Sequence, residues 1–368
     1  MIIRKKTKVV RIGGKKIGGT NPVLVQSMAN TKTEDLKLTV KQIHQLEKAG
    51  CEIVRVAVHS LEAAKNLKQI KKEISIPLVA DIQFNYQWAI ESARGGADKI
   101  RINPGNIGSK EKIREVVEAC KSFGLPIRIG INHGSLEQDF FSKYGRFGTA
   151  KVMLESVSRQ IQILENLHFY NIVVSLKSSS VEETIDACRL FSQRFSYPQH
   201  LGITEAGTFL PGVVKSSIGI GTLLGEGIGD TIRISLTDNP VEEVKTGWEI
   251  LKALNLRQKG PNLISCPTCG RTEIDLIGLA KKVEEILEGV EKPITVAVMG
   301  CAVNGPGEAR EADIGIAGGK KMAVIFSKGK IIKSVKESGI LPAFKKELTK
   351  LLRGSSFRKK GGQKGKKL

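Results

Sequence analysis

The chain has 368 residues, of which 40% are hydrophobic and 26% charged, and its formal net charge is +21. This length suffices for one large and one small domain. No run approaches the ~18 apolar residues of a membrane span, and the opening segment Met1–Lys6 lacks the apolar core of a signal peptide. We therefore expect a cytoplasmic protein, in which thiols serve more often as metal ligands than as disulfides.

Residues 1–20 predict a short hairpin around Gly13–Lys16 that caps the first domain. After it, β-branched runs alternate with amphipathic helical stretches. The eight predicted strands are Val23–Met28, Ile53–Val58, Pro77–Ile82, Lys99–Pro104, Pro126–Asn132, Asn171–Lys177, His200–Ala206 and Thr231–Thr237. The predicted helices include Thr33–Ala49, Leu61–Glu73, Lys110–Phe123, Ala150–Leu167, Val181–Phe195, the glycine-rich Lys215–Asp230 and Pro240–Leu254. Eight such units predict an α/β fold, a (β/α)8 TIM barrel over residues 1–254, with an open doubly wound sheet as the alternative.

Four of the predicted strands carry one arginine each inside a β-branched run, and a fifth ends in a lysine. These cations are Arg55, Arg101, Arg128, Lys177 and Arg233. Strands of a parallel barrel are buried on both faces, so a lone charge there is costly unless it is paired. One such arginine could belong to an internal salt bridge. The whole set indicates a pocket for a dianionic or trianionic ligand.

The active site of such a barrel lies at the carboxyl ends of its strands. Other polar residues expected at this rim are Asp81, Asn103, Asn132, Glu205 and Ser235. Glu205 is an acid among cations and therefore a candidate proton donor or base. A simple salt-bridge role for Glu205 is the alternative.

After the barrel we expect a linker over residues 255–265, a small α+β domain over 266–352 and a disordered basic tail over 353–368. Apolar residues from Leu276 to Val290 follow a helical spacing. Ile294–Met299 and Ala312–Ala317 are expected as strands, Met322–Val335 as a hairpin and Ala343–Leu352 as the last helix. The tail carries seven of the positive charges and no acid.

Three of the six cysteines lie in this second domain: Cys266, Cys269 and, in a glycine-rich loop that also holds Glu308, Cys301. A structural zinc needs four ligands, and neither a fourth cysteine nor a histidine occurs after His200. A thioredoxin-like pair leaves Cys301 unexplained. An iron–sulfur cluster with three thiolates and the weaker ligand Glu308 fits best, and a substrate oxygen could displace that carboxylate. The other cysteines are expected as core thiols: Cys51, Cys120 and Cys188.

The positive charge leaves a second class open, an RNA-binding or RNA-modifying iron–sulfur protein. Aromatic residues make up only 5% of the chain and do not interleave with the basic ones. RNA binders use surface cations together with aromatic side chains for stacking. Arginines inside barrel strands favour a small anionic ligand instead.

Five segments are distinctive enough to compare with known families. They are Lys99–Gly108 (KIRINPGNIG), Gly202–Gly207 (GITEAG), Gly227–Leu236 (GIGDTIRISL), Cys266–Gly270 (CPTCG) and Gly300–Ala309 (GCAVNGPGEA). With these motifs the chain, up to about residue 352, resembles the 4-hydroxy-3-methylbut-2-en-1-yl diphosphate synthase family of the non-mevalonate isoprenoid pathway. The short linker resembles the two-domain bacterial form.

The resemblance implies reductive ring opening and dehydration of 2-C-methyl-D-erythritol 2,4-cyclodiphosphate to the linear hydroxymethylbutenyl diphosphate, using two electrons. It implies a 4Fe–4S cluster on Cys266, Cys269, Cys301 and Glu308. Reduced ferredoxin or flavodoxin would supply electrons to this cluster. The barrel cations then become the diphosphate clamp, and Glu205 manages a proton on the leaving oxygen. Strand three departs from the family, which usually has histidine where this chain has Gln83. Glutamine cannot act as a proton donor near neutral pH.

The end of the barrel predicts an oligomer. Helix Pro240–Leu254 must run antiparallel to strand eight, so it ends at the face opposite the pocket. Residues Asn255–Ser265 span at most about 36 Å at ~3.3 Å per residue, so folding back needs an extended, unsupported strap. We expect a homodimer in which each cluster domain serves the other chain's barrel, as the resemblance also implies. A monomer that folds back on itself is the alternative.

Overall fold

The computed structural model describes residues 2–132, 149–301 and 309–354. The chain divides into two compact units, Met1–Arg257 and Gln258–Leu368. The expectations for Glu308 and for the basic tail beyond Gly354 lie outside the described residues. No described helix is both long and apolar enough to cross a lipid bilayer.

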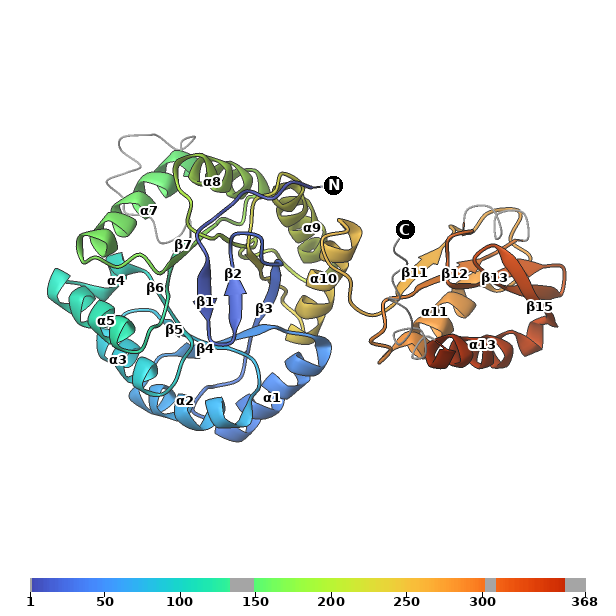
Figure 1. The fold of residues 1–368 in the computed structure, drawn as a ribbon, viewed down its shortest axis with the longest axis horizontal. Coiled ribbons are helices and arrows are strands. Elements are labelled where there is room, and N and C mark those ends of the chain that lie inside the picture. The colour runs from blue at the N-terminus through green and yellow to red at the C-terminus, as the bar shows by residue number, and fades with distance from the viewer. Residues whose placement is uncertain (1, 133–148, 302–308, 355–368) are drawn as a thin grey trace, which may run out of the picture. The chain divides into compact units, whose positions relative to one another are not determined.

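The first unit is built on eight parallel strands arranged as a nearly closed barrel (Figure 1). They are β3 (Leu24–Met28), β4 (Ile53–Val58), β5 (Leu78–Ile82), β6 (Lys99–Ile102), β7 (Ile127–Asn132), β8 (Ile172–Lys177), β9 (His200–Leu201) and β10 (Thr231–Ile232). They pair in the order β8-β7-β6-β5-β4-β3-β10-β9. A bridge from Val174 of β8 to Gln199, with a 2.9 Å hydrogen bond from Val174 N to Pro198 O, joins the two ends. The expected (β/α)8 fold is confirmed.

Helices surround this barrel (Figure 1). They are α1 (Leu36–Ala49), α2 (Leu61–Glu73), α3 (Tyr86–Arg94), α4 (Pro104–Ile107), α5 (Lys110–Ser122), α7 (Thr149–Asn166), α8 (Val181–Arg194), α9 (Phe209–Gly225) and α10 (Pro240–Ala253). Several begin at a residue whose side-chain oxygen accepts a backbone N–H of the first turn. These capping residues are Asp35, Ser60, Asn85, Ser180 and Asn239. Capping fixes where each helix begins after its strand.

Two predicted strands are shorter than expected. His200–Ala206 and Thr231–Thr237 reduce to the two-residue strands β9 and β10. Beyond β9, Glu205 and Gly207 have φ of 52° and 111°, which a regular strand cannot accommodate. The rim at these two strands is therefore made of irregular loops.

Two helices also differ from expectation. The seventh predicted helix begins at Phe209 rather than Lys215 and ends at Gly225, because Gly227 takes a φ of 79°. Helix α3 was not predicted. Its buried positions are the small residues Ala89, Ser92 and Ala93, which give a weak apolar pattern.

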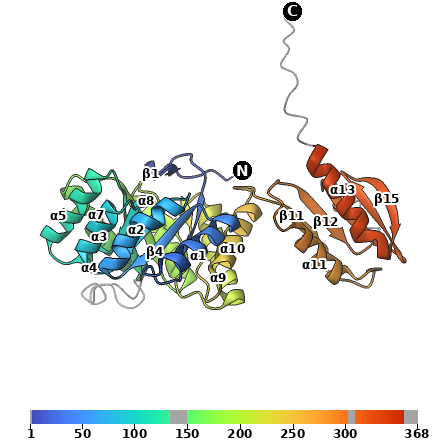
Figure 2. The ribbon, with the colours of Figure 1, turned by 90° about the horizontal axis from the view of Figure 1, so that it is seen from below.

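The expected N-terminal hairpin is present as β1 (Val10–Ile12) and β2 (Lys15–Ile17), which pair antiparallel. It lies across one end of the barrel (Figures 1 and 2). Its apolar side chains form a cluster with residues near the amino-terminal ends of four strands. That cluster is Val10, Ile12, Ile17, Leu24, Ile53, Val79 and Val173. The hairpin closes the amino-terminal end and leaves the carboxyl ends for a site.

The second unit holds a five-stranded sheet in the order β11 (Asn262–Ser265), β12 (Thr295–Met299), β13 (Ile314–Gly319), β14 (Met322–Ser327) and β15 (Lys330–Lys336). The first three strands run parallel, and the last two form an antiparallel hairpin, as expected for Met322–Val335. Helices α11 (Leu276–Leu287) and α13 (Ile340–Gly354), the latter after the 3-10 turn Glu337–Gly339, pack on the face that carries Val296 and Val298.

The linker is shorter than the expected 255–265. Residues Asn262–Ser265 pair with Thr295–Val298 of β12 as an edge strand. Their main-chain hydrogen bonds are satisfied by this sheet, so they belong to the second unit. Only residues 254–261 separate α10 from β11.

Candidate active site

Strand register brings charged side chains together inside the barrel. Asp81 of β5 pairs with Arg101 of β6, and Arg101 pairs with Arg128 of β7. Lys177 of β8 pairs with Asn132 where both strands end. Side chains at one register level of a parallel sheet point to the same face. The sequence-predicted cations therefore line one interior surface.

Asp81 is the carboxylate that two of these arginines share. Its Oδ1 accepts a hydrogen bond from Arg101 Nη1 at 3.0 Å, and its Oδ2 lies 3.6 Å from Arg55 Nε. Burial acts to raise the pKa of Asp81, but Arg55, Arg101 and Arg128 together bring that pKa below its ordinary value. Asp81 is therefore ionised and neutralises part of the positive charge.

Glu243, in the first turn of α10, is a second carboxylate that the sequence-based reasoning missed. It is only 3% exposed. It accepts from Arg233 Nη2, Ser27 Oγ and the Leu236 amide, each at 3.1 Å. An acid in the first turn of a helix is ordinary, since it complements the helix dipole, so the sequence offers no sign of this inward role.

Arg128 and Lys177 have no carboxylate partner among the described residues. Arg128 is 1% exposed, and its Nε and Nη1 meet no hydrogen-bond partner there. Burial, and then the neighbouring cations, lowers the pKa of both side chains well below the ordinary values. The described barrel interior thus holds more cations than carboxylates, and a polyanion is the ligand that would balance it.

Two glycines let these cations lie against the strands. A Cβ on Gly130 would come within 2.7 Å of Arg101 Nε. A Cβ on Gly202 would come within 2.5 Å of both Lys177 Nζ and the Arg233 carbonyl oxygen. These close approaches require glycine because the cations and the main chain already fill the space.

A deeper polar layer was also missed. Lys99 is fully buried two residues before Arg101, and its Nζ donates to Gln26 Oε1 at 3.4 Å. His200 is fully buried too, with Nδ1 2.8 Å from Thr231 Oγ1 and no described partner for Nε2. Burial, followed by nearby cations, lowers the pKa of Lys99 and of His200 well below the ordinary values. The two-residue spacing of Lys99 and Arg101 was the available signal, since it places both on one strand face.

Glu205 lies in the loop after β9, exposed and with a left-handed φ of 52°. Within the described chain it has no hydrogen-bond or ion-pair partner, so the salt-bridge alternative finds no support there. A non-glycine residue rarely adopts this conformation unless the surrounding structure holds it. The loop therefore presents a carboxylate at the carboxyl end of the barrel.

The remaining predicted residues lie at or just beyond the carboxyl ends of their strands. Asn103 is buried and its Oδ1 caps α4 at Gly105 N (3.1 Å) while accepting from Gln160 Nε2 (2.9 Å). Ser235, after β10, and Asn132, at the end of β7, are half-buried at the rim. Gln83 is exposed, with Nε2 3.5 Å from Asp81 Oδ1.

The cysteines of the second unit lie at one edge of its sheet. Cys266 follows β11 and the buried Cys301 follows β12, and the Gly300 amide donates to Cys266 Sγ at 3.3 Å. Cys269 is exposed, and the backbone amide of Arg271 is the main cause that lowers the pKa of its thiol.

The described residues contain no assembled group of three or more cysteine, histidine or acidic side chains close enough for a metal ion. Cys266 and Cys301 follow neighbouring parallel strands, and Cys269 lies in the turn after Cys266, so three soft thiols lie at one edge of the sheet. This donor set fits an iron–sulfur group and leaves a fourth ligand to be supplied from outside the described residues.

The other three cysteines are core thiols. Cys51, Cys120 and Cys188 are buried, and desolvation raises the pKa of each thiol to about 12. Thiolates are the reactive and metal-binding form of cysteine. These residues therefore pack as small apolar groups and take no part in the site.

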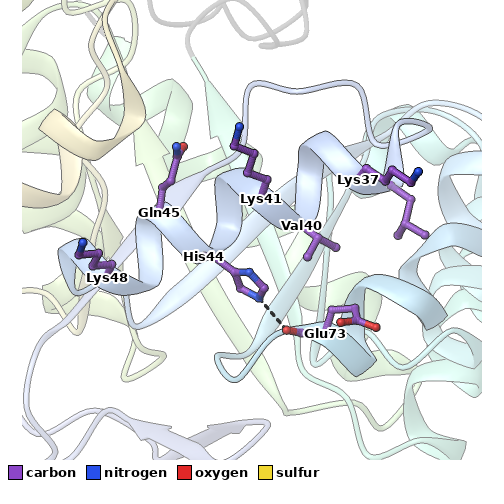
Figure 3. A pocket seen from close by; sticks show the side chains of 8 residues that line it. Lys37, Val40, Lys41, His44, Gln45, Lys48 and Glu73 are labelled. Carbon is purple, nitrogen blue, oxygen red and sulfur yellow. Dashed lines mark hydrogen bonds between the residues drawn. The ribbon is translucent and has the colours of Figure 1, made fainter.

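The described residues line a surface groove on each of the two units. One, of about 640 Å³, runs along the outer side of α1, where His44 Nε2 lies 2.8 Å from the Glu73 carbonyl oxygen (Figure 3). Its lysines Lys37, Lys41 and Lys48 come from a single helix surface, with no convergent catalytic group. The other, of about 420 Å³, lies between Cys266 and α11.

Comparison with known proteins gives a consistent result. The GcpE TIM-barrel domain family matches residues 7–248, and the GcpE protein C-terminal domain family matches residues 262–350. A relative from Caldanaerobacter subterraneus subsp. tengcongensis, named 4-hydroxy-3-methylbut-2-en-1-yl diphosphate synthase (flavodoxin), is 58% identical over 95% of this chain and 99% of its own. One of the same name from Fusobacterium nucleatum subsp. nucleatum is 53% identical over 94% and 98%.

Among solved structures, dihydropteroate synthase from Stenotrophomonas maltophilia superposes with a TM-score of 0.50 at 12% identity. It covers 68% of this chain and 97% of its own. At this identity the likeness extends to the barrel fold and not to the chemistry.

Proposed function

The chain belongs to the GcpE family, the 4-hydroxy-3-methylbut-2-en-1-yl diphosphate synthases of isoprenoid biosynthesis, and on this premise we propose a role for each part of its site. The protein is an iron–sulfur oxidoreductase that opens 2-C-methyl-D-erythritol 2,4-cyclodiphosphate reductively and forms the linear hydroxymethylbutenyl diphosphate. The observation that carries the assignment of roles is the surplus of buried cations inside the barrel.

The barrel cations bind the diphosphate. Its charge satisfies the donors that Arg128 leaves unpaired and balances Lys177, which has no carboxylate partner among the described residues, and Arg55, Arg101 and Arg233 each keep a carboxylate that fixes their position. Charge-assisted hydrogen bonds to phosphate oxygens are among the strongest available to a protein. Asn132 and Ser235, half-buried at the rim, orient the ring, and Asp81 holds two arginines rather than touching the anion.

Cys266, Cys269, Cys301 and Glu308 hold the iron–sulfur group, and a 4Fe–4S cluster is the type we propose. When bound, it supplies two electrons per turnover and a Lewis-acidic iron. The chain itself would provide three soft thiolate ligands and one hard carboxylate ligand that binds iron more weakly. A carboxylate among thiolates is the ligand most easily exchanged for another oxygen.

Glu205 holds the proton that the leaving oxygen takes up. Its exposed carboxyl group lies on a loop whose left-handed backbone sets the direction of the Cα–Cβ bond. The exposed Gln83 cannot perform this task, because an amide does not ionise near neutral pH. It can donate a hydrogen bond, as it does towards Asp81.

Reduced flavodoxin is the proposed electron donor, because the relatives are named as flavodoxin-dependent enzymes, with ferredoxin as the alternative. We place the protein in the cytoplasm, where thiols stay reduced and available as ligands.

The working unit is a homodimer in which each second unit serves the barrel of the other chain. Helix α10 runs back from the carboxyl end of β10 and ends at the amino-terminal face. The connection from Leu254 to Pro261 spans at most about 26 Å at ~3.3 Å per residue. This is shorter than the sequence-based estimate, because β11 takes up four of those residues, and it makes folding back onto the same barrel still harder.

Anaerobic assay tests the function directly. Purified protein with reconstituted iron and sulfide receives the cyclodiphosphate and dithionite-reduced methyl viologen, and the linear diphosphate is measured by mass spectrometry. Formation of that product at two electrons per molecule is expected. A brown, fully loaded protein that leaves the cyclodiphosphate unchanged with every donor contradicts the proposal.

A further inference from the structure

The hairpin side of the second unit is unusually basic. Residues 314–336 contain six lysines and no aspartate or glutamate. The six are Lys320, Lys321, Lys328, Lys330, Lys333 and Lys336, and all are exposed. Within the described chain only Lys328 has an ion-pair partner, Asp313 Oδ1 at 3.9 Å. The other five lysines do not stabilise the described fold by ion pairing, so another partner is open to them.

Sheet topology sorts the lysines between two opposite edges. Strand β13 runs parallel to β12, so its end and the turn Lys320–Lys321 lie at the edge where β12 leads to Cys301. Strand β15 pairs Lys336 with Met322, which brings Lys336 back to that same edge. The turn around Lys328 and Lys330 lies at the opposite edge.

A chain of contacts joins the cysteines to these lysines. The Gly300 amide donates to Cys266 Sγ at 3.3 Å, and a Cβ on Gly318 would lie 2.7 Å from the Gly300 carbonyl oxygen. Lys320 follows Gly318 by two residues. The Glu337 amide donates to the Lys321 carbonyl oxygen at 3.4 Å, which holds the end of β15 against the turn.

We propose that this edge is the docking surface for an acidic electron-carrier protein, held by Lys320, Lys321 and Lys336 around the 48% exposed side chain of Met322. The inference rests on the proposed function, which requires electrons to reach the cysteine edge. Complementary charge steers such encounters and keeps them fast and short-lived. An exposed methionine among cations gives the adaptable apolar centre that transient interfaces use.

The other charged groups at this edge leave its net charge positive. Arg271, near the exposed Cys269, adds a cation, whereas Glu273, Asp275 and Glu337 are exposed acids among the described residues there. Nucleic acid is disfavoured, because stacking needs exposed aromatic rings. The one aromatic residue of the 314–336 segment is Phe326, which is fully buried.

Two charge-reversed holoenzymes test this surface. Lys320→Glu with Lys336→Glu changes the cysteine edge, and Lys330→Glu with Lys333→Glu makes the same net change elsewhere on β15. All four side chains are exposed, and matching thermal unfolding curves check that both variants fold. Turnover is measured with a purified bacterial flavodoxin and, separately, with reduced methyl viologen. Titration of oxidised flavodoxin by calorimetry gives a readout that does not depend on turnover.

The first variant should raise the KM for flavodoxin about tenfold at low salt, within the range that steering contributes. Its turnover with methyl viologen should stay within about twofold of wild type, because a small donor needs no docking surface. The control variant should change the flavodoxin KM less than about threefold. At 1 M salt, where the Debye length is ~3 Å, the difference should largely vanish.

Equal effects of the two variants, or unchanged flavodoxin binding in the first, overturn the docking surface while leaving the proposed function intact. A parallel loss with methyl viologen also overturns it, because the lysines then serve the substrate site. A wild-type protein inactive with methyl viologen overturns the proposed function itself.

Discussion

In the barrel, the charged side chains of the site are buried and held in place by strand register, whereas the second unit carries its cysteines on turns at a sheet edge. Arg128 is buried with two donors unpaired among the described residues, but Cys269 is exposed. The barrel therefore has its geometry before any ligand arrives and bears an electrostatic penalty until an anion enters. The cysteine edge bears no such penalty and depends on its ligand for final order. Removing the unpaired Arg128 from the barrel should therefore weaken substrate binding without destabilising the free protein. Removing a cysteine from the second unit should lower iron content without weakening substrate binding.

The largest effect is expected for Cys301→Ser. Loss of one of three soft ligands should lower iron and sulfide content and abolish turnover, because a hydroxyl is a poor ligand for iron–sulfur groups. Cyclodiphosphate binding, measured by calorimetry, should survive because the barrel cations are untouched. Cys120→Ser is the matched control, since that buried thiol lies in the barrel core and should leave iron content unchanged. Normal iron content in the Cys301 variant would refute its role as a ligand.

Glu205→Gln should lower kcat by about 10²- to 10⁴-fold, the usual contribution of general acid–base catalysis. The substrate Kd should stay near the wild-type value, because the diphosphate contacts other residues. Calorimetry and steady-state kinetics separate the two quantities. A collapse of affinity with turnover preserved per bound complex assigns Glu205 to binding or folding instead.

Arg128→Met separates stability from binding in the barrel. Affinity for the cyclodiphosphate should fall by about 2–5 kcal/mol, the cost of truncating one partner of a buried charged pair. The free protein should be unchanged or more stable by about 1–4 kcal/mol, because an unpaired buried charge disappears. Arg101→Met is the matched control: it removes the arginine that donates to Asp81 at 3.0 Å, leaves that carboxylate with Arg55 at 3.6 Å, and should destabilise by up to about 3–5 kcal/mol. The free energy of unfolding of each variant is measured with denaturant in the absence of ligand. Equal destabilisation of both variants would refute the claim that the free barrel holds a surplus of buried positive charge.

A smaller effect concerns pH. The pKa of Lys99 is lowered in the fold by burial and then by Arg128 and Arg55, so the unfolded chain holds a proton that the folded chain has released. Stability therefore rises with pH between the lowered pKa and the ordinary value of 10.5, by at most about 1.4 kcal/mol per pH unit. Lys99→Met should flatten this rise, measured as unfolding free energy against pH. An unchanged slope means that Lys99 keeps its proton in the fold.

The features that could be predicted from the sequence are those that a single strand or helix pattern determines. Strand–helix alternation identified the barrel, and arginines in β-branched runs identified its cations, because parallel strands leave no exposed face for them. Glu243 and His200 could not be found this way. Their inward roles depend on the register of β9, β10 and α10, and an acid in a first helical turn is ordinary on its own. The short β9 was missed because Ile203 continues an apolar run that the φ of Glu205 interrupts.

The central claim is that one working site needs both regions, from two chains, and complementation tests it most directly. Chains carrying Cys301→Ser and chains carrying Glu205→Gln, each inactive alone, are refolded together and loaded with iron and sulfide. Random pairing puts half of the dimers in the mixed form, where one site of two is intact, so about a quarter of wild-type activity should return. A mixture that demonstrably contains heterodimers yet stays inactive places the site within one chain and contradicts the account.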